Sequence, residues 1–153
     1  MKKTRIGLLA ALGVAMLFVA ACKLATVSLA LFDVTGAKTA VNPGDTVNFG
    51  TAKTSPPQPQ TRTFRIENTG AADYRLPFSG GRVFISGADA SHFNIPTQPP
   101  QSIPPGGSAN FDIVFSATTL GSNFTRNAVI GISSIDTHDG SISFNVTGTD
   151  QFS

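Results

Sequence analysis

Short runs in which apolar and polar residues alternate dominate the chain after residue 26, whereas helical periodicity is hard to find there. In the clearest run, Phe111, Ile113 and Phe115 alternate with mostly polar neighbours, which is typical of a strand with one buried face. A second clear run covers residues 141–148. The pattern predicts further strands at residues 27–34, 46–49, 61–68, 74–78, 82–86, 93–96 and 124–133.

Proline and glycine mark the turns between these strands. Asn42–Asp45 and Pro104–Gly107 each place proline before glycine, an order that a type II turn favours. Asp139-Gly140 predicts a tight hairpin between the last two strands. The prolines in residues 55–60 predict an extended loop, and Asp89 is placed to start a single helical turn over residues 88–92.

These elements predict an all-β fold. About nine short strands, each with one apolar face, cannot remain solvated, and two antiparallel sheets packed face to face are the simplest arrangement that buries them. The inward positions of the clearest strands predict a core made of Phe64, Ile66, Ile85, Phe93, Phe111, Ile113, Phe115, Ala128, Ile130, Ile132, Ile142, Phe144 and Val146.

The first 21 residues follow a different pattern. Lys2, Lys3 and Arg5 form a short basic region, and an apolar run follows from residue 6 to residue 21. This run is too short for a comfortable transmembrane helix and has the layout of a secretory signal peptide. It closes with Val19-Ala20-Ala21-Cys22, and Cys22 is the only cysteine in the chain.

An aliphatic residue, two small residues and a cysteine resemble the lipobox of bacterial lipoproteins. The resemblance implies cleavage between Ala21 and Cys22 and attachment of diacylglyceryl and acyl groups to Cys22, with residues 22–26 as a short tether. Lys23, not Asp, follows the cysteine, so the protein resembles lipoproteins that are sorted to the outer membrane. The alternative is an ordinary signal peptide that happens to precede a cysteine.

Removal of the signal peptide changes the charge of the protein. The chain has 11 basic and 9 acidic residues, and the signal peptide holds three of the basic ones. The mature chain therefore has 8 basic against 9 acidic residues, a net charge of −1. Such a charge gives no electrostatic basis for binding nucleic acid. With Cys22 acylated, no thiol remains for a disulfide, so the core alone must hold the domain.

Four ordered blocks of sequence are similar to a known bacterial family. The blocks are Val34–Gly36, Val47–Gly50, Thr63–Gly70 and Ile85–Phe93, and the last is continued by Pro105–Ser108 and Phe111–Phe115. Together they resemble the bacterial choice-of-anchor D domain, which is related to the abnormal-spindle/hydin (ASH) type of immunoglobulin-like domain. The resemblance covers residues 27–149.

This resemblance implies an immunoglobulin-like antiparallel β-sandwich of about 7–9 strands over residues 27–149, followed by a C-terminal tail at 150–153. It implies no catalytic role, because such domains are mostly scaffold or adhesion modules. The chain departs from the family habit in holding one copy with an expected N-terminal lipid anchor. Asn68-Thr69-Gly70 is expected to end a strand with a residue at positive φ. The small residues between Ile85 and Phe93 are expected to let the chain pass close to the sheet.

The sequence offers little catalytic chemistry. Asp136, His138 and Asp139 are conceivable metal ligands, but they lack a second ligand cluster and fit a polar hairpin loop. The chain has no Gly-x-Ser-x-Gly elbow for a serine nucleophile and no phosphate-binding glycine loop. We therefore expect no catalytic residue, no metal and no cofactor.

Three functions remain open. The favoured one is a non-catalytic module, lipid-anchored in the cell envelope at the outer membrane, that binds another protein or an envelope polymer. The first alternative is a purely structural or accessory lipoprotein without a separable ligand. The second is a small-ligand carrier or an enzyme.

A direction can be assigned to the loops if the strands alternate in direction from residue 27 onward. Loops 35–44, 69–72, 87–92 and 117–123 would then lie far from the lipid, and loops 50–60, 79–81, 98–107 and 134–140 would face the membrane. Loops on a rigid sandwich often carry recognition. The candidate partner-binding residues of the far loops are Asp89, Ser91, His92, Thr118, Thr119 and Asn123.

Overall fold

The structure, a computed structural model, describes residues 28–78, 81–118, 123–135 and 142–152. Its elements are β1 (Leu29–Asp33), β2 (Thr39–Ala40), β3 (Thr46–Thr54), β4 (Pro57–Gln58), β5 (Gln60–Asn68), β6 (Tyr74–Arg75), β7 (Val83–Ser86), the 3₁₀ turn η1 (Ala90–His92), β8 (Phe93–Asn94), β9 (Ser102–Ile103), β10 (Ser108–Phe115), β11 (Phe124–Ile132) and β12 (Ile142–Gln151).

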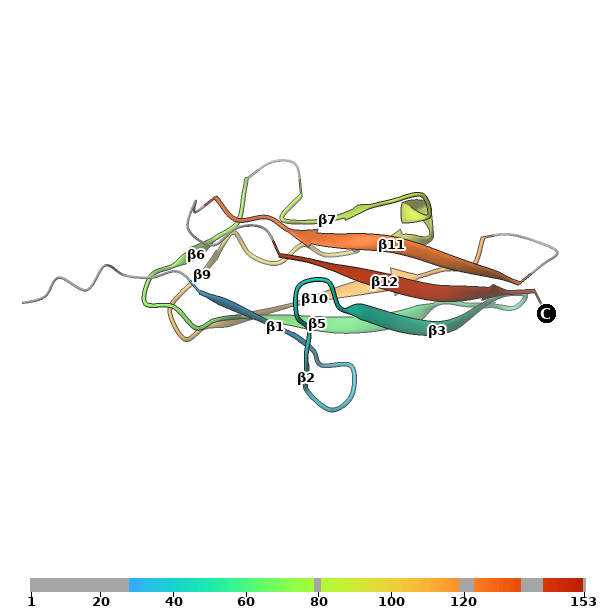
Figure 1. Cartoon of the computed structure of the whole chain (residues 1–153), viewed down its shortest axis with the longest axis horizontal. Coiled ribbons are helices and arrows are strands. Elements are labelled where there is room, and N and C mark those ends of the chain that lie inside the picture. The colour runs from blue at the N-terminus through green and yellow to red at the C-terminus, as the bar shows by residue number, and fades with distance from the viewer. Residues whose placement is uncertain (1–27, 79–80, 119–122, 136–141, 153) are drawn as a thin grey trace, which may run out of the picture.

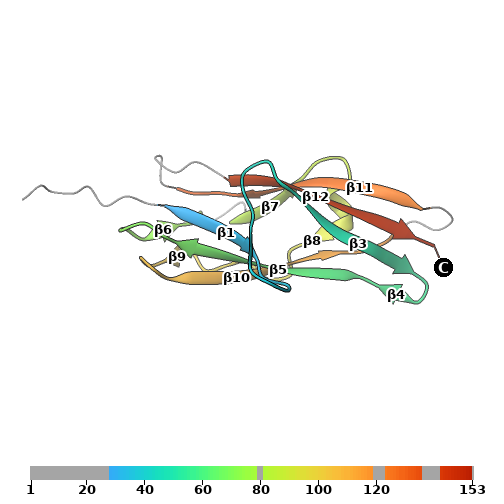
Figure 2. The same cartoon turned by 60° about the horizontal axis from the view of Figure 1, so that its bottom comes forward.

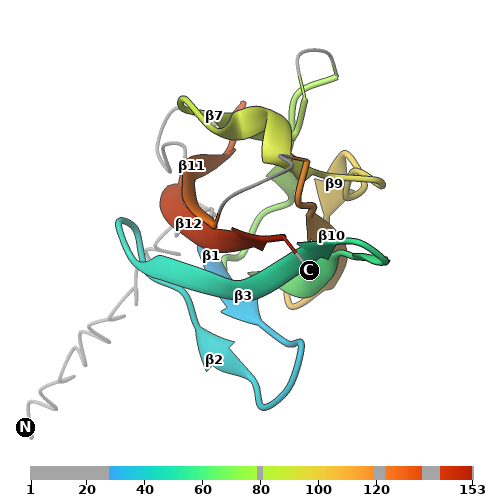
Figure 3. The ribbon, with the colours of Figure 1, turned by 90° about the vertical axis from the view of Figure 1, so that its right-hand side faces the viewer.

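The strands form two five-stranded sheets that pack face to face, with a small third sheet beside them (Figure 1 and Figure 3). The first sheet has the order β2-β1-β5-β10-β8 and the second β4-β3-β12-β11-β7, while β6 pairs with β9. This is the immunoglobulin arrangement once the short β2 and β4 are set aside. β1, β5, β10 and β8 correspond to strands A, B, E and D, and they face β7, β11 and β12, which correspond to strands C, F and G. The expected all-β, immunoglobulin-like sandwich is confirmed.

The first strand of the sandwich is divided between the two sheets. β1 pairs antiparallel with β5 in the first sheet. The chain then crosses to the second sheet, where β3 pairs parallel with β12. β1 and β3 run in the same direction, and both point toward the end of the sandwich at which β12 finishes (Figure 2). We call this the far end, and the end at which β1 begins the near end.

This division makes the expected alternation of strand direction wrong. Loop 69–72 lies at the near end, where the Thr69 amide donates to the Ser28 carbonyl at 2.9 Å. Residues 53–60 lie at the far end instead, as the hairpin that joins β3, β4 and β5. Residues 42–44 of loop 35–44 lie away from the far end, because the Gly44 amide donates to the Ser143 carbonyl at the start of β12. The described parts of loops 87–92 and 117–123 lie at the far end, as expected.

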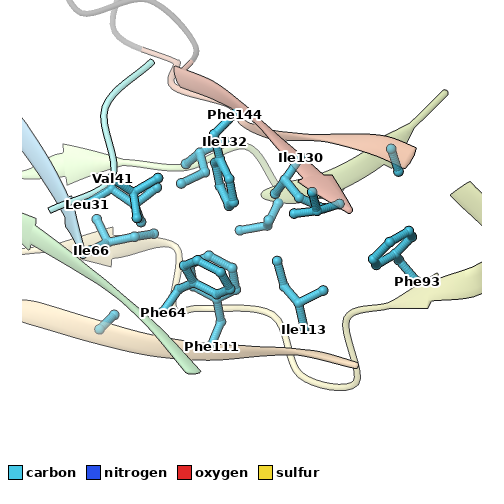
Figure 4. Packing of buried hydrophobic residues seen from close by; sticks show 14 of the residues in the cluster. Leu31, Val41, Phe64, Ile66, Phe93, Phe111, Ile113, Ile130, Ile132 and Phe144 are labelled. Carbon is cyan, nitrogen blue, oxygen red and sulfur yellow. The ribbon is translucent and has the colours of Figure 1, made fainter. Parts of the chain in front are cut away.

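Side chains from both sheets meet in one core, which Figure 4 shows from close by. All of the expected core residues are buried except Ile85 and Ile142, which are partly buried. Phenylalanine rings join the layers: the ring centroids of Phe64 and Phe144 lie 5.2 Å apart, and those of Phe64 and Phe111 lie 5.6 Å apart. The sequence pattern missed the buried Phe49, because its segment is too short to show a clear alternation.

Glycine takes positive φ at the turns where it was expected. Gly44 has a φ of 85° and Gly106 a φ of 71°, and each turn is closed by a hydrogen bond between its first and last residue. Gly87 has a φ of 105°, and a Cβ atom there would lie 3.4 Å from Ala128 Cα. The close passage of this segment over the sheet is therefore confirmed.

The motif Asn68-Thr69-Gly70 has a different role from the expected one. Neither Asn68 nor Gly70 takes a positive φ. Asn68 is buried instead, and its Nδ2 donates to the carbonyls of Ala72 and Ile103, both at 2.8 Å, while its Oδ1 accepts from the Gly70 amide at 2.9 Å. One side chain thus ties β5, the following turn and β9 together.

Two segment boundaries differ from the expected ones. The proline-rich segment 55–60 is not one extended loop, because Pro57–Gln58 pairs with the end of β3 as β4. The C-terminal tail does not begin at residue 150, because β12 continues to Gln151. Asp150 has no exposed surface, and its carboxylate is held by an arginine on β11, which explains why the strand extends past the apolar residues.

Replacement of Phe111 by Ala tests the role of the ring cluster. The side chain is 3% exposed, and removal of a buried ring of this kind costs about 3–5 kcal/mol in the free energy of unfolding. We expect a large fall in the melting temperature, measured by circular dichroism. Phe152→Ala is the matched control, since Phe152 is 53% exposed, and it should melt close to wild type. Equal melting temperatures for all three proteins would contradict the assigned core.

Candidate functional site

The candidate loop residues gather only in part. Asp89 precedes the single turn η1 and His92 is its last residue; η1 lies beside β11 near the far end (Figure 1), and Thr118 follows β10 there. Thr118 Oγ1 and His92 Nδ1 are 3.2 Å apart, so the structure joins these two loops. Ser91 and Asn123 are exposed, and Thr119 lies outside the described residues.

An arginine outside the predicted loops, Arg126, connects the cluster. Arg126 on β11 donates from Nε to Asp150 Oδ2 on β12 at 2.8 Å, and its Nη1 lies 3.4 Å from Asp89 Oδ1. His92 Nδ1 lies 3.6 Å from the same Asp150 oxygen. Arg126 therefore holds one carboxylate from the sheet and one from the loop, which fixes η1 against the far end of the core.

The alternation of β11 and β12 contains a signal for this ion pair. Arg126 continues the inward positions of Ala128 and Ile130, and Asp150 continues those of Phe144 and Val146. The two residues follow the inward side of neighbouring strands, so opposite charges there predict a buried pair.

Hydrogen bonds hold Asp89 in its ionised form. The backbone amide of Asn127 donates to Asp89 at 2.9 Å, and this bond, together with Arg126, holds the pKa of Asp89 below its usual range. Asp89 therefore stays ionised at neutral pH. Within the described residues, nothing donates a hydrogen bond to the other oxygen of Asp150, Oδ1, which makes the arginine contact more important for this buried carboxylate.

Two exposed aromatic residues complete the far-end surface. Phe124 is 43% exposed and Phe152 is 53% exposed. Phe124 pairs with Asp150 in the β11–β12 ladder, and Phe152 directly follows the last residue of β12, two positions after Asp150. The guanidinium carbon of Arg126 lies 4.9 Å from the centroid of the Phe124 ring. The far-end surface comprises Asp89, His92, Thr118, Phe124, Arg126 and Phe152.

The carboxylates of this surface are already paired. Asp89 and Asp150 are both held by Arg126, and Asp150 has no exposed surface with which to reach a substrate. Among the residues that the structure describes, no group of three or more His, Cys, Asp or Glu side chains is arranged to hold a metal ion. The metal ligands considered above, Asp136, His138 and Asp139, lie outside these residues.

The expected anchor cannot be placed in the structure. Ala21 and Cys22 lie outside the described residues, the first of which is Ser28. In the part of the chain that is described, no helix is both long and apolar enough to cross a membrane.

The fold and this surface define an immunoglobulin-like β-sandwich module. No protein-family model and no curated protein matches the chain. Its fold is similar to that of a protein of unknown function from Porphyromonas gingivalis W83, with 16% identity and a TM-score of 0.50, over 81% of this chain and 46% of that one. It is also similar to a family 123 glycoside hydrolase from Clostridium perfringens, with 11% identity and a TM-score of 0.52, over 84% of this chain and 28% of that one. The chain thus spans less than half of either protein, and at these identities the likeness concerns the fold alone.

Replacement of Arg126 by Met tests the ion pair. The change leaves the buried Asp150 carboxylate without its partner, and breaking a buried pair in this way costs about 3–5 kcal/mol in the free energy of unfolding. Denaturant titration should show this loss. The double variant Arg126→Met/Asp150→Asn removes both charges and should recover part of it. If the loss of free energy in the double variant equals the sum of the losses in Arg126→Met and Asp150→Asn, the two side chains are not directly coupled.

Proposed function

We propose that the protein is a non-catalytic envelope lipoprotein whose immunoglobulin-like module is tethered through Cys22 to the bacterial outer membrane and binds a partner protein at its far end. The lipobox-like sequence Val19–Cys22 supports the anchor, and the resemblance to the choice-of-anchor D domain supports a scaffold or adhesion role. The proposal names a protein as the partner. An envelope polymer is the other partner class that fits such a module.

One observation carries the proposal: the chain enters the sandwich at one end, and the far-end surface lies at the other. β1 begins at Leu29 at the near end, a few residues after Cys22. β12 runs to the opposite end and carries Asp150 there. A lipid on Cys22 would therefore hold the near end at the membrane and leave the far end accessible to partners.

The composition of the far-end surface favours a protein over a polymer. Exposed phenylalanines and an arginine are the residue types that are enriched at the centres of protein interfaces. Phe124, Phe152 and Arg126 supply them, and the ionised Asp89 and the hydroxyl of Thr118 add polar groups around them. The ion pairs also fix η1, so little conformational entropy would be lost when a partner binds.

Site-specific photo-crosslinking in intact cells of the source bacterium tests the binding surface. A photoreactive phenylalanine analogue at position 152 or 118 should give one adduct of the same mass, because both positions border the same surface. The matched control is the analogue at Phe84, which is 38% exposed and lies on β7, an edge strand of the second sheet. It should give no such adduct.

A second substitution links the adduct to the surface chemistry. Phe124→Ser should lower the yield of the adduct at position 152 about tenfold or more, because removal of a main aromatic contact costs about 2 kcal/mol or more in binding free energy. An equal yield at Phe84, or a yield at position 152 that Phe124→Ser leaves unchanged, would contradict binding at the far end. Repetition with Cys22→Ser reports whether capture requires the anchor.

A further inference from the structure

A small apolar patch lies at the opposite side of the molecule from the far-end surface. Phe78 is 88% exposed and Ile135 is 53% exposed, whereas Leu76 beneath them is 2% exposed. The Ile135 amide donates to the Arg75 carbonyl at 3.1 Å, which brings the two segments together. They surround a hollow of about 280 Å³ lined by Arg75, Leu76, Phe78, Gln101, Ser102 and Ile135. We call this set the near-end patch.

Hydrogen bonds connect the near-end patch to the start of the domain. Tyr74 and Arg75 form β6, which pairs with Ser102–Ile103 of β9. The Ile103 carbonyl accepts from Asn68, and the next residue, Thr69, donates to Ser28, the first described residue. The patch therefore belongs to the end of the sandwich at which the chain enters, as the positions of β6, β9 and the start of β1 show (Figure 1).

We propose that the near-end patch rests on the phospholipid bilayer that holds the lipidated Cys22. This inference depends on the proposed function. Cys22 precedes Ser28 by six residues, which span at most roughly 20 Å even when fully extended, so a bilayer that holds the cysteine lies within reach of this end.

The chemistry of the near-end patch fits the interface of a bilayer. Phe78 and Ile135 offer apolar side chains that gain by leaving water, and phenylalanine is common on the apolar side of peptides and enzymes that lie in the interface. Arg75 stands at the rim of the same hollow, where its charge complements the phosphate groups of lipids. The patch is too small to hold a protein on a membrane alone, but beside a covalent lipid it supplies a second contact.

The second contact has a consequence for orientation. An acyl chain alone would fix one point of the domain and leave its tilt free. A second point of contact at Phe78 restricts the tilt and keeps Phe124 and Phe152 away from the lipid.

Tryptophan fluorescence tests the contact, because the chain has no tryptophan of its own. Phe78→Trp introduces a single reporter at a position that is 88% exposed, and Ile135→Trp is a second reporter in the same patch. Phe152→Trp is the matched control at the far end. Each full-length protein is expressed with its signal peptide, purified in its mature form and reconstituted into vesicles of phosphatidylethanolamine and phosphatidylglycerol. One vesicle set carries brominated acyl chains, which quench nearby tryptophan, and circular dichroism checks each fold.

We expect brominated lipid to lower the emission of the Phe78→Trp and Ile135→Trp proteins at least twofold and to leave Phe152→Trp unchanged. Unquenched reporters in a protein that floats with the vesicles would overturn the bilayer contact and leave the proposed anchor intact. Unquenched reporters are also the result expected if the near-end patch binds a protein and not the bilayer. Equal quenching at positions 78 and 152 would overturn the proposed orientation. Failure to float with the vesicles would overturn the proposed anchor, and the bilayer contact with it.

Discussion

The two sheets depend on phenylalanine rings that meet between them. Phe64 of β5 lies 5.2 Å from Phe144 of β12, and Phe49 of β3 lies 5.6 Å from Phe93 of β8, measured between ring centroids. The chain has one cysteine and no tryptophan, so an internal disulfide is impossible and the pin of antibody domains is absent. Ring packing takes over the role of that pin. The ion pair of Arg126 and Asp150 lies within the second sheet, and the side chain of Asn68 joins the first sheet to β9, so these contacts add to the ring packing and do not replace it.

The divided first strand sets the polarity of the molecule. β1 and β3 each pair with a different sheet and run in the same direction, which leaves the start of the chain and the finish of β12 at opposite ends. Under the proposed function, this polarity separates two tasks. The near end carries the lipid and the apolar patch around Phe78, and the far end carries the ion pairs of Arg126 and the exposed rings.

The sequence predicts the long strands well, because a period of two identifies the buried face over residues 111–115 and 128–132. It predicts direction poorly, since β2 has two residues and nothing in the alternation shows that the chain changes sheets between β1 and β3. The sequence does not reveal the pair of Arg126 and Asp150 for a related reason. A polar residue at an inward position usually indicates that a strand has ended, and the pair becomes visible only when the two strands are aligned. The motif that begins at Asn68 is expected to end β5 through a backbone at positive φ, but Asn68 acts through the hydrogen bonds of its side-chain amide.

Mass spectrometry of the mature N-terminal peptide, taken from the membrane fraction of the source bacterium, tests the central claim most directly. The polarity of the sandwich acquires a function only if its near end is held at a membrane. We predict that the mature chain begins at Cys22 and that this residue carries a diacylglyceryl group on sulfur. A mature chain that retains Cys22 as a free thiol, or that begins after it, would contradict the account.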